Sequence, residues 1–437
     1  MEPMFEMPLW ACIPFVLMLL TIAIAPLVAD RWWSRNINKL LISFLLGVPT
    51  ALYLVLHGMS DEIEHQMLEE YLPFIILLMA LFVITGGIHL SGDIRATPGI
   101  NTLFLGIGYL LASLMGTTGA AMLLIRPLLD TNSQRQYKVH TVMFFIAAVA
   151  NCGGLLTPLG DPPLFLLYLK GASFTWFLGL WKQWLFTGAV LLLVYYLLDR
   201  FHYYPKETFA ARRSDLEEVK PLKVDGKFNL VYLLGVIAAV AFINAGFIPE
   251  MGEPDAPVWV KYLREIVLVS LIFLSMYTTK AQVRADNHYS WRPIIEVAVV
   301  FLGIFVTMIP AMSYLQANAA SFGLTKPWHF FYATGALSSF LDNAPTALAF
   351  HGVASGLVAS GQAMAEVAGI PEKLLEAISM GAVYFGAMTY IGNGPNFMVK
   401  SVAEEQGVKM PSFFGYMVKM SFIVLLPIYV AVQLIFF

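Results

Sequence analysis

Charged residues are scarce in this 437-residue chain. Asp, Glu, Lys and Arg together make up 13% of it, whereas in a water-soluble domain about a quarter of all residues are charged. The shortage argues against a soluble protein. Hydrophobic residues make up 58% of the chain, and apolar runs repeatedly reach the length of a membrane-spanning helix. We therefore expect an all-α polytopic membrane protein embedded in a lipid bilayer.

Other features that the chain lacks or has in small number argue against further classes of protein. Only two cysteines occur, Cys12 and Cys152, both in apolar segments, so nothing indicates a disulfide framework. The net charge is only −3 and no basic patch suggests nucleic acid, so no nucleic-acid partner is expected. The first ten residues lack the Lys or Arg of a cleavable signal peptide, which predicts that the first apolar run is retained. The longest polar stretch, 200–227, is too short to fold alone, and no cofactor is expected.

The apolar runs are of two kinds. Uninterrupted runs of spanning length lie at about 8–28, 39–57, 71–90, 183–199, 228–248, 263–279, 293–312 and 412–434. Two other apolar regions, 102–130 and 329–357, are interrupted by GTTG and DNAP, and 141–180 and 373–405 are interrupted by NCGGLLTPLGDPP and IGNGPN. Gly and Pro break helices, and broken backbone is tolerated in hydrocarbon only where protein or water satisfies it.

The distribution of Lys and Arg predicts the orientation. These residues concentrate in 28–39, 200–227 and 280–292, which we place in the cytoplasm, and they are missing from 58–70 and 249–260, which we place outside. Each arm of 102–130 has about half the usual spanning length, so a re-entrant hairpin entered from the cytoplasm is expected. The prediction is a multi-pass protein of the cell inner membrane with both termini outside.

The resulting path divides the chain into two inverted repeats. Residues 1–200 and 228–437 each contain five full crossings, one of them a broken helix, plus one re-entrant hairpin, and 201–227 forms a cytoplasmic linker. Five is an odd number, so the halves must have opposite orientations, as in many secondary transporters. The breaks also align: LLASLMGTTGAAM can be laid on ALSSFLDNAPTAL, and LGDPP on IGNGP.

The breaks concentrate the polar side chains of the apolar regions. Asp161 and Asp342 each lie at a break, and buried membrane acids are functional candidates. Their polar companions are Asn151, Asn343, Asn393, Asn396, Thr117, Thr118 and Thr157. Carboxylate, amide and hydroxyl oxygens suit hard cations such as Na⁺ or Li⁺. A buried carboxylate neutralised by either H⁺ or Na⁺ is the minimal device for exchanging these ions.

Structural roles compete with these functional ones. Asp161 precedes two prolines and could cap a helix, and Asp342 in DNAP could do the same. The Asn and Thr residues could simply satisfy freed backbone groups. Arg126 and Lys400 are interpreted as snorkelling side chains, and His351 as a satisfied packing residue.

The motifs AVANCGGLLTPLGDPP (148–163) and SSFLDNAPTALAF (338–350) resemble the ion transporter superfamily. Within it, the chain is most similar to the NhaD-like sodium/proton antiporter branch, whose members are often labelled citrate transporters. The resemblance implies a homodimer and a transport domain that moves like an elevator against a static scaffold. It also implies that Asp161 and Asp342, with Asn343, bind the transported cation and proton. The chain departs from the dicarboxylate branch, because GTTG and DNAP replace paired Ser-Asn-Thr tips.

The sequence leaves several functions open. Exchange of Na⁺ or Li⁺ for H⁺ is the leading hypothesis, and a carrier of citrate, a dicarboxylate or arsenite is the alternative, because half-helix N-termini can hold an anion. An intramembrane aspartyl protease would also use two membrane acids, but PLGD (158–161) lacks the first Gly of the Gly-x-Gly-Asp pattern. A passive channel fits broken inverted repeats less well than alternating access does.

Overall fold

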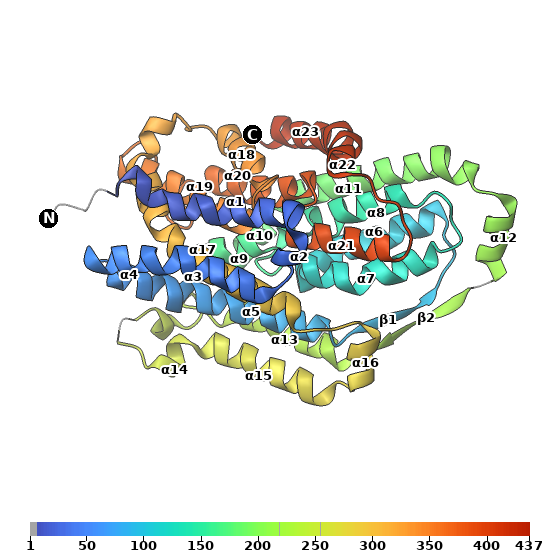
Figure 1. The fold of residues 1–437 in the computed structure, drawn as a ribbon, viewed down its shortest axis with the longest axis horizontal. Coiled ribbons are helices and arrows are strands. Elements are labelled where there is room, and N and C mark those ends of the chain that lie inside the picture. Colours follow the sequence, from blue (N-terminus) through green and yellow to red (C-terminus); the bar gives the residue numbers. More distant parts are fainter. Residues whose placement is uncertain (1–6, 218, 254) are drawn as a thin grey trace. The chain divides into compact units, whose positions relative to one another are not determined.

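The computed structural model describes residues 7–217, 219–253 and 255–437, and it is mostly helical, as the composition predicts (Figure 1). Within the described residues, eight helical segments are long and apolar enough to cross a membrane. They are Leu9–Pro26, Asn36–Leu56, Ser60–Thr85, Pro98–Met115, Val139–Leu156, Trp181–Lys206, Arg292–Ala317 and Phe413–Phe436. The shorter apolar helices α13 (Phe228–Phe242) and α15 (Leu263–Thr278) occupy two further runs predicted to span. The expectation of a multi-pass helical protein is confirmed in this coarse form.

The chain forms two compact units, each assembled from both halves of the sequence. Unit 1 contains residues up to 78, 162–173 and 290–386, and unit 2 contains 79–161, 174–289 and 387–437. The predicted inverted repeats, 1–200 and 228–437, divide the chain differently from these two units, and they stay a prediction. Its first six residues lie outside the described part of the chain, as does position 218 of the predicted linker.

Unit 1 is a bundle of apolar helices. Its elements are α1 (Ile13–Val28), α2 (Asp30–Trp33), α3 (Asn36–Leu56), α4 (Ser60–His65), a π-helix (Gln66–Tyr71), the first half of α5 (Leu72–Thr85), α9 (Pro162–Leu169), α17 (Arg292–Ala317), α18 (Pro327–Ser338), α19 (Asn343–Ala359) and α20 (Glu372–Phe385). α3 packs along α17, where the buried Lys39 pairs with Glu296 at 2.6 Å. α18 packs along α20, and there Gly335 leaves room for the ring of Phe385.

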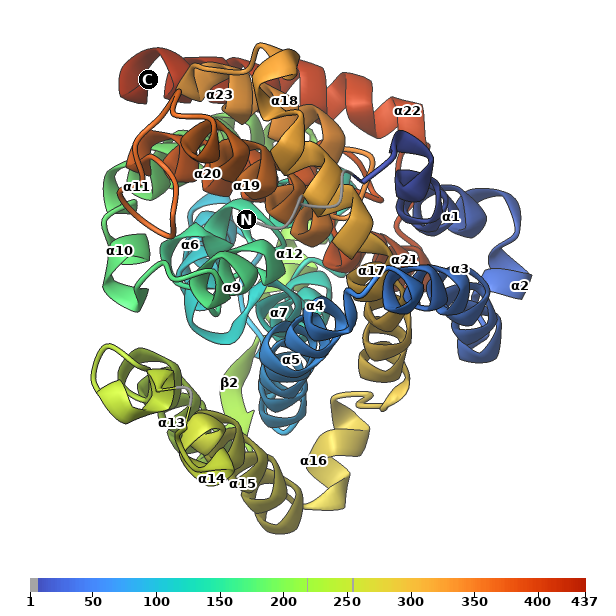
Figure 2. The ribbon, with the colours of Figure 1, turned by 90° about the vertical axis from the view of Figure 1, so that its left-hand side faces the viewer.

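Unit 2 contains the remaining helices and a small sheet. The helices are α6 (Pro98–Met115), α7 (Thr117–Thr131), α8 (Val139–Ala148), α10 (Phe174–Leu178), α11 (Trp181–Leu198), α12 (Phe209–Glu217), α13, α14 (Val258–Lys261), α15, α16 (Ala281–Asp286), α21 (Gly394–Glu405), α22 (Phe413–Tyr416) and α23 (Leu426–Phe436). α13 and α15 lie side by side (Figure 1 and Figure 2). A π-helix (Met417–Leu425) joins α22 to α23, and another (Asp199–Tyr203) extends α11.

Three sequence expectations need correction. The all-α prediction missed the antiparallel pair of β1 (His89–Asp93) and β2 (Lys220–Asp225), since each strand is stabilised only by a partner distant in the sequence. The outer loop expected at 58–70 is largely helical, so the third long helix begins at Ser60. The arms of the first hairpin are not half-length, because α6 has 18 residues and α7 has 15. The re-entrant course of both hairpins stays a prediction.

The breaks themselves fall where Gly and Pro predict them. Gly116 separates α6 from α7, and residues 339–342 separate α18 from α19. The interruption after α8 holds a 3-10 turn, Cys152–Leu156, and α9 begins at the first proline of the PP pair. The interruption after α20 also begins with a 3-10 turn, Gly386–Met388, before α21. At all four breaks, backbone N–H and C=O groups leave the regular helical hydrogen bonding and become polar groups within otherwise apolar segments.

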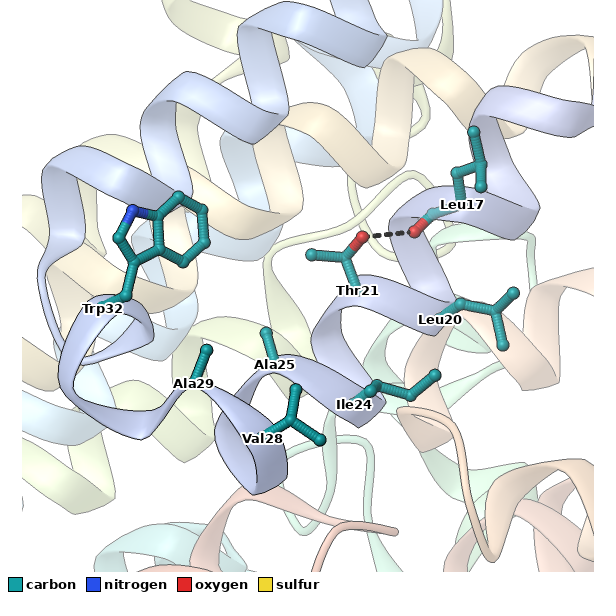
Figure 3. A pocket seen from close by; sticks show the side chains of 8 residues that line it. All are labelled: Leu17, Leu20, Thr21, Ile24, Ala25, Val28, Ala29 and Trp32. Carbon is teal, nitrogen blue, oxygen red and sulfur yellow. Dashed lines mark hydrogen bonds between the residues drawn. The ribbon is translucent and has the colours of Figure 1, made fainter.

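A shallow apolar groove runs along α1 and α2 in unit 1. Its cavity volume is about 280 Å³, and its lining residues are Leu17, Leu20, Thr21, Ile24, Ala25, Val28, Ala29 and Trp32 (Figure 3). The hydroxyl of Thr21, the one side-chain polar group among them besides the indole, donates to the carbonyl of Leu17 at 2.7 Å. The groove contains none of the predicted site residues, so the site must be sought in the broken helices.

Candidate functional site

Asp161 lies buried in unit 2, where two other breaks reach it. The hydroxyl of Thr117 donates to Asp161 Oδ1 at 2.7 Å, and Nδ2 of Asn393 donates to the same oxygen at 3.1 Å. These three residues come from the tip of the first hairpin and from the two broken helices. Asp161 and Thr117 are 1% exposed and Asn393 is 4% exposed, so this carboxylate is held by protein groups away from bulk solvent.

The partners of Asp161 stand at helix N-termini. Thr117 is the first residue of α7, and Asn393 is the N-cap of α21. Gly116 turns the chain into α7 with φ of +80°, a conformation that favours glycine, and the Thr117 amide donates to the Gly160 carbonyl at 2.7 Å. Helix N-termini carry partial positive charge. The ends of α7 and α21 therefore favour a negative charge on Asp161.

The amide of Asn393 is the centre of a wider polar network. Its Nδ2 also lies 3.2 Å from the carbonyl oxygen of Ala150 and 3.2 Å from Oδ1 of Asn151. Asn151 Nδ2 in turn donates to Oδ1 of Asn396 at 2.6 Å. Three oxygens, those of Ala150, Asn151 and Asp161, thus converge on one nitrogen atom. Asn151 and Asn396 are fully buried, which makes this a satisfied polar core within unit 2.

Thr157 and Thr118 have different surroundings. The Thr157 hydroxyl donates to the Ser113 carbonyl and accepts from the Leu159 amide at 3.2 Å, so Thr157 shapes the loop before Asp161. This agrees with the interpretation that some break residues only satisfy backbone groups. Thr118 follows Thr117 in α7 and is partly exposed.

Glycines allow the loop around Asp161 to close on itself. A Cβ placed on Gly160 would lie 1.9 Å from the carbonyl oxygen of Gly154, and one placed on Gly154 would lie 2.7 Å from the Thr117 side chain. Only a residue without a side chain fits either position. Gly154 and Gly160 of the motif are therefore required by the close packing of this loop on itself and against Thr117.

We expect Gly160→Ala to destabilise the protein by about 3 kcal/mol or more, because the methyl group meets rigid backbone rather than a flexible side chain. The apparent midpoint of thermal unfolding in detergent measures the effect. Gly394→Ala is the matched control, since a Cβ there has no heavy atom within 4 Å in the described structure. Equal midpoints for the two variants would contradict the requirement for glycine.

Asp342 and Asn343 belong to unit 1. Asp342 is the N-cap of α19: its Oδ1 accepts from the Ala344 amide at 3.0 Å, and its carbonyl accepts from the Thr346 hydroxyl at 2.8 Å. The capping role considered from the sequence is thus confirmed for Asp342, and it engages one carboxylate oxygen. Asn343 is buried at the first position of α19.

Two further hydroxyls, which the sequence did not single out, shape the breaks. Ser113 donates to the Gly153 carbonyl at 2.5 Å and accepts from the Leu156 amide at 3.1 Å. The Thr389 hydroxyl accepts from the amides of residues 391 and 392, and its carbonyl accepts from Asn396 at 2.8 Å. Ser113 is in the hairpin arm just before GTTG, and Thr389 comes two residues before IGNGPN. Both residues could have been predicted from the sequence, because each hydroxyl lies next to a break in an apolar segment.

A buried ionic cluster in unit 2 was also missed. Arg135 forms two hydrogen bonds with Asp199, at 2.9 and 2.5 Å, and its Nε lies 3.4 Å from Glu207. His140 Nε2 lies 3.0 Å from the same Asp199. Burial lowers the pKa of Arg135, but the hydrogen bonds and charge of Asp199 outweigh it, so the pKa is raised overall. These residues join the loop after α7 to the end of α11.

The remaining polar candidates have ordinary partners. His351 Nε2 lies 2.9 Å from the Ala368 carbonyl, which confirms it as a satisfied packing residue. Lys400 pairs with Glu404 at 2.7 Å. Across the described residues, no group of three or more His, Cys, Asp or Glu side chains is placed to hold a metal ion.

Long apolar helices, four breaks and a buried carboxylate among helix N-termini define a multi-pass membrane protein of the transporter class. Residues 4–437 match the model of a family described as "Putative citrate transport", and the chain belongs to this family. No curated protein matches the chain at significant similarity. The match is consistent with the resemblance to the ion transporter superfamily. Family and fold together point to a transporter rather than an enzyme, against the intramembrane protease alternative.

Proposed function

We propose that the protein is a secondary active transporter that exchanges Na⁺ or Li⁺ for H⁺. The observation that carries the proposal is the convergence of the Ala150, Asn151 and Asp161 oxygens on Nδ2 of Asn393. Three oxygens that surround one amide nitrogen at 3.1–3.2 Å can also surround a small cation. Hard cations such as Ca²⁺ take oxygen ligands at about 2.3–2.6 Å, so each oxygen would move inward by less than about 1 Å.

A rotation of the Asn393 side chain would open the site to the cation. Its amide NH₂ group lies among the three oxygens, and the proposed cation would take this position instead. Rotation of this amide would withdraw the NH₂ group and present the carbonyl oxygen Oδ1 instead, because an Asn side chain carries donors and an acceptor at the same end. Thr117 can add its hydroxyl oxygen, since that hydroxyl already contacts Asp161.

Asp161 would bind the proton when the cation leaves. Burial away from bulk water makes ionisation of Asp161 costly, and the ends of α7 and α21 offset only part of that cost, so protonation replaces the charge lost with the cation. The same oxygen atom then alternates between Na⁺ and H⁺, and the two ions exclude each other. This competition couples their movements in opposite directions.

Other parts of the proposal rest on the family resemblance. We infer that Asp342, with Asn343, contributes the second ion-binding acid through the carboxylate oxygen not engaged in its helix cap. An elevator-like movement and a homodimer follow from the same resemblance, whereas the re-entrant hairpins follow from the path traced through the interrupted apolar regions. The orientation, with both termini outside the inner membrane, follows from the distribution of Lys and Arg.

Transport of citrate is the second candidate, and the family description favours it. The N-termini of α7 and α21 could hold an anion. They are already directed at the carboxylate of Asp161, however, and a second carboxylate beside it would be repelled. Bound citrate would therefore need a cation or a proton on Asp161 first.

Purified protein in liposomes that contain a pH-sensitive dye separates these candidates. An external pulse of Na⁺ or Li⁺ should make the lumen alkaline, because entering cations displace protons, while K⁺ and citrate should give no such response. Protein-free liposomes are the control. Uptake of labelled citrate without any response to Na⁺ or Li⁺ would reject cation exchange in favour of the second candidate.

A further inference from the structure

The basic stretch 200–227, which contains the cytoplasmic linker expected at 201–227, carries its acidic and basic side chains on two different faces. Its acids Glu207 and Asp215 are 6% and 9% exposed, and Asp199 immediately before it is fully buried. Glu207 accepts from the amides of residues 136 and 137, and Asp215 accepts from the Ala96 amide at 2.9 Å. Asp199 is bound by Arg135. The three acidic side chains are therefore buried against partners within unit 2.

Six of the seven basic residues of the same stretch are exposed, and Arg212 is half-buried. The exposed ones are Arg200, Lys206, Arg213, Lys220, Lys223 and Lys227. Arg213 pairs with Glu217 and Lys223 with Asp225, so these two pairs are neutral. The other four basic residues outnumber the one remaining acid of the stretch, Glu218, which lies outside the described residues. The outward face therefore carries a net positive charge.

Large apolar side chains interleave with these positive charges. Phe209 at the start of α12 is 82% exposed, Phe201 is 71% exposed and Leu222 on β2 is 48% exposed. Such exposure of two phenylalanines beside lysines is costly in water. Basic residues mixed with exposed aromatic and aliphatic residues are characteristic of segments that lie in a membrane interface.

The position of the linker brings this face to the bilayer. α11, whose extended helix ends at Lys206, and α13, which begins at Phe228, are both apolar helices, and the linker joins them directly. Within unit 2, α12 lies beyond the end of α11, and β2 leads back to α13 (Figure 1). The linker therefore stays beside the membrane surface from which both helices emerge.

We propose that the outward face of residues 200–227 binds anionic phospholipid headgroups, with Lys220, Lys227 and Arg200 contacting phosphates and Phe209 inserted between the headgroups. Charge complementarity selects this occupant, since anionic lipids attract juxtamembrane basic residues. The proposal requires only that the chain spans a bilayer and does not depend on the ion that it transports. In this proposal the small sheet has a structural role. Pairing of β2 with β1 holds Lys220 and Leu222 on the outward face.

A spin label on the full-length protein tests the proposal. The label is attached at Ala210→Cys in a Cys12→Ser background, because Ala210 is exposed on α12 and Cys152 is fully buried. The protein is reconstituted in phosphatidylcholine with or without about one third phosphatidylglycerol. With phosphatidylglycerol, contact of the label with oxygen should rise and contact with a water-soluble nickel chelate should fall. About 1 M NaCl, where the Debye length is about 3 Å, should reverse the change.

Variants identify the groups responsible. Each basic residue near an anionic surface strengthens binding about fivefold, so Lys220→Gln with Lys227→Gln should reduce the ratio of docked to undocked linker on the order of 25-fold. Phe209→Ser should also reduce docking, but without changing its dependence on salt. Lys326→Gln with Lys373→Gln is the matched control, since both lysines are exposed on unit 1 and far from the linker in sequence. Equal label environments in the two lipid mixtures, or a lipid effect that survives Lys220→Gln with Lys227→Gln, would overturn the proposal.

Discussion

Replacing Asp161 by Asn is expected to reduce sodium-driven proton movement in proteoliposomes by about 100-fold or more. The substitution removes the negative charge while keeping the shape of the side chain and an oxygen that can accept from Thr117. Losing one partner of a buried charged contact costs about 2–5 kcal/mol, which corresponds to roughly 30-fold or more in affinity. Without an ionisable group at this position, the exchange of Na⁺ for H⁺ has no site for the proton.

The measurement is the initial rate of dye response after a sodium pulse, compared at equal protein content. Asp61→Asn provides the matched control, because Asp61 is an exposed acid on α4. The unfolding midpoint of the Asp161 variant should stay near that of the parent protein. Normal sodium-driven proton movement in Asp161→Asn would reject the proposed exchange site.

Asp342→Asn extends the same prediction to unit 1. Asn is as good a helix N-cap as Asp, so α19 should keep its cap when the charge is removed. A loss of exchange in a stably folded Asp342→Asn variant would therefore report on ionisation, whereas unchanged exchange would leave Asp342 with its capping role alone.

Arg135→Gln is expected to destabilise the protein by about 3–5 kcal/mol. Arg135 is 5% exposed and is the main positive partner of the fully buried Asp199, with Glu207 on its other side. Removing one member of a buried ion pair leaves an uncompensated charge in a poorly solvated position. His140 can replace only part of the interaction, since it contacts a single oxygen of Asp199.

Thermal unfolding in detergent measures this effect as a lower apparent midpoint. Lys138→Gln is the matched control: Lys138 lies three residues away, and its Nζ donates to two backbone carbonyls at 3.1 and 3.2 Å, so its loss should cost about 1 kcal/mol. Adding Asp199→Asn to Arg135→Gln should restore part of the stability, because it removes the unpaired charge. A double variant less stable than Arg135→Gln alone would show that the ion pair is not the source of the effect.

Much of the architecture follows from local composition. Apolar runs of spanning length predict membrane helices because nothing else can satisfy the backbone in hydrocarbon. Gly and Pro predict the positions of the breaks, as at Gly116 and at 151–163, because their effects on the backbone are local. The same local reasoning placed the third helix too late, since only the apolar run from residue 71 was counted as spanning, although the polar residues before it belong to the same helical segment. The β1–β2 pair could not be foreseen, since more than a hundred residues separate its strands.

The sequence by itself determined that this is a multi-pass helical membrane protein with polar breaks, and it singled out Asp161, Thr117, Asn151, Asn393 and Asn396 as polar residues of those breaks. Only the tertiary structure decided that these five belong to one hydrogen-bonded network, in which Asn393 occupies the point where three oxygens converge. It also decided that Asp342 caps a helix, and that Arg135 and Asp199 form a buried pair. The physical reason is that a helix break depends on the residue type and the residues next to it in the chain. The partner of a buried polar atom depends instead on the packing of segments that are distant in the chain.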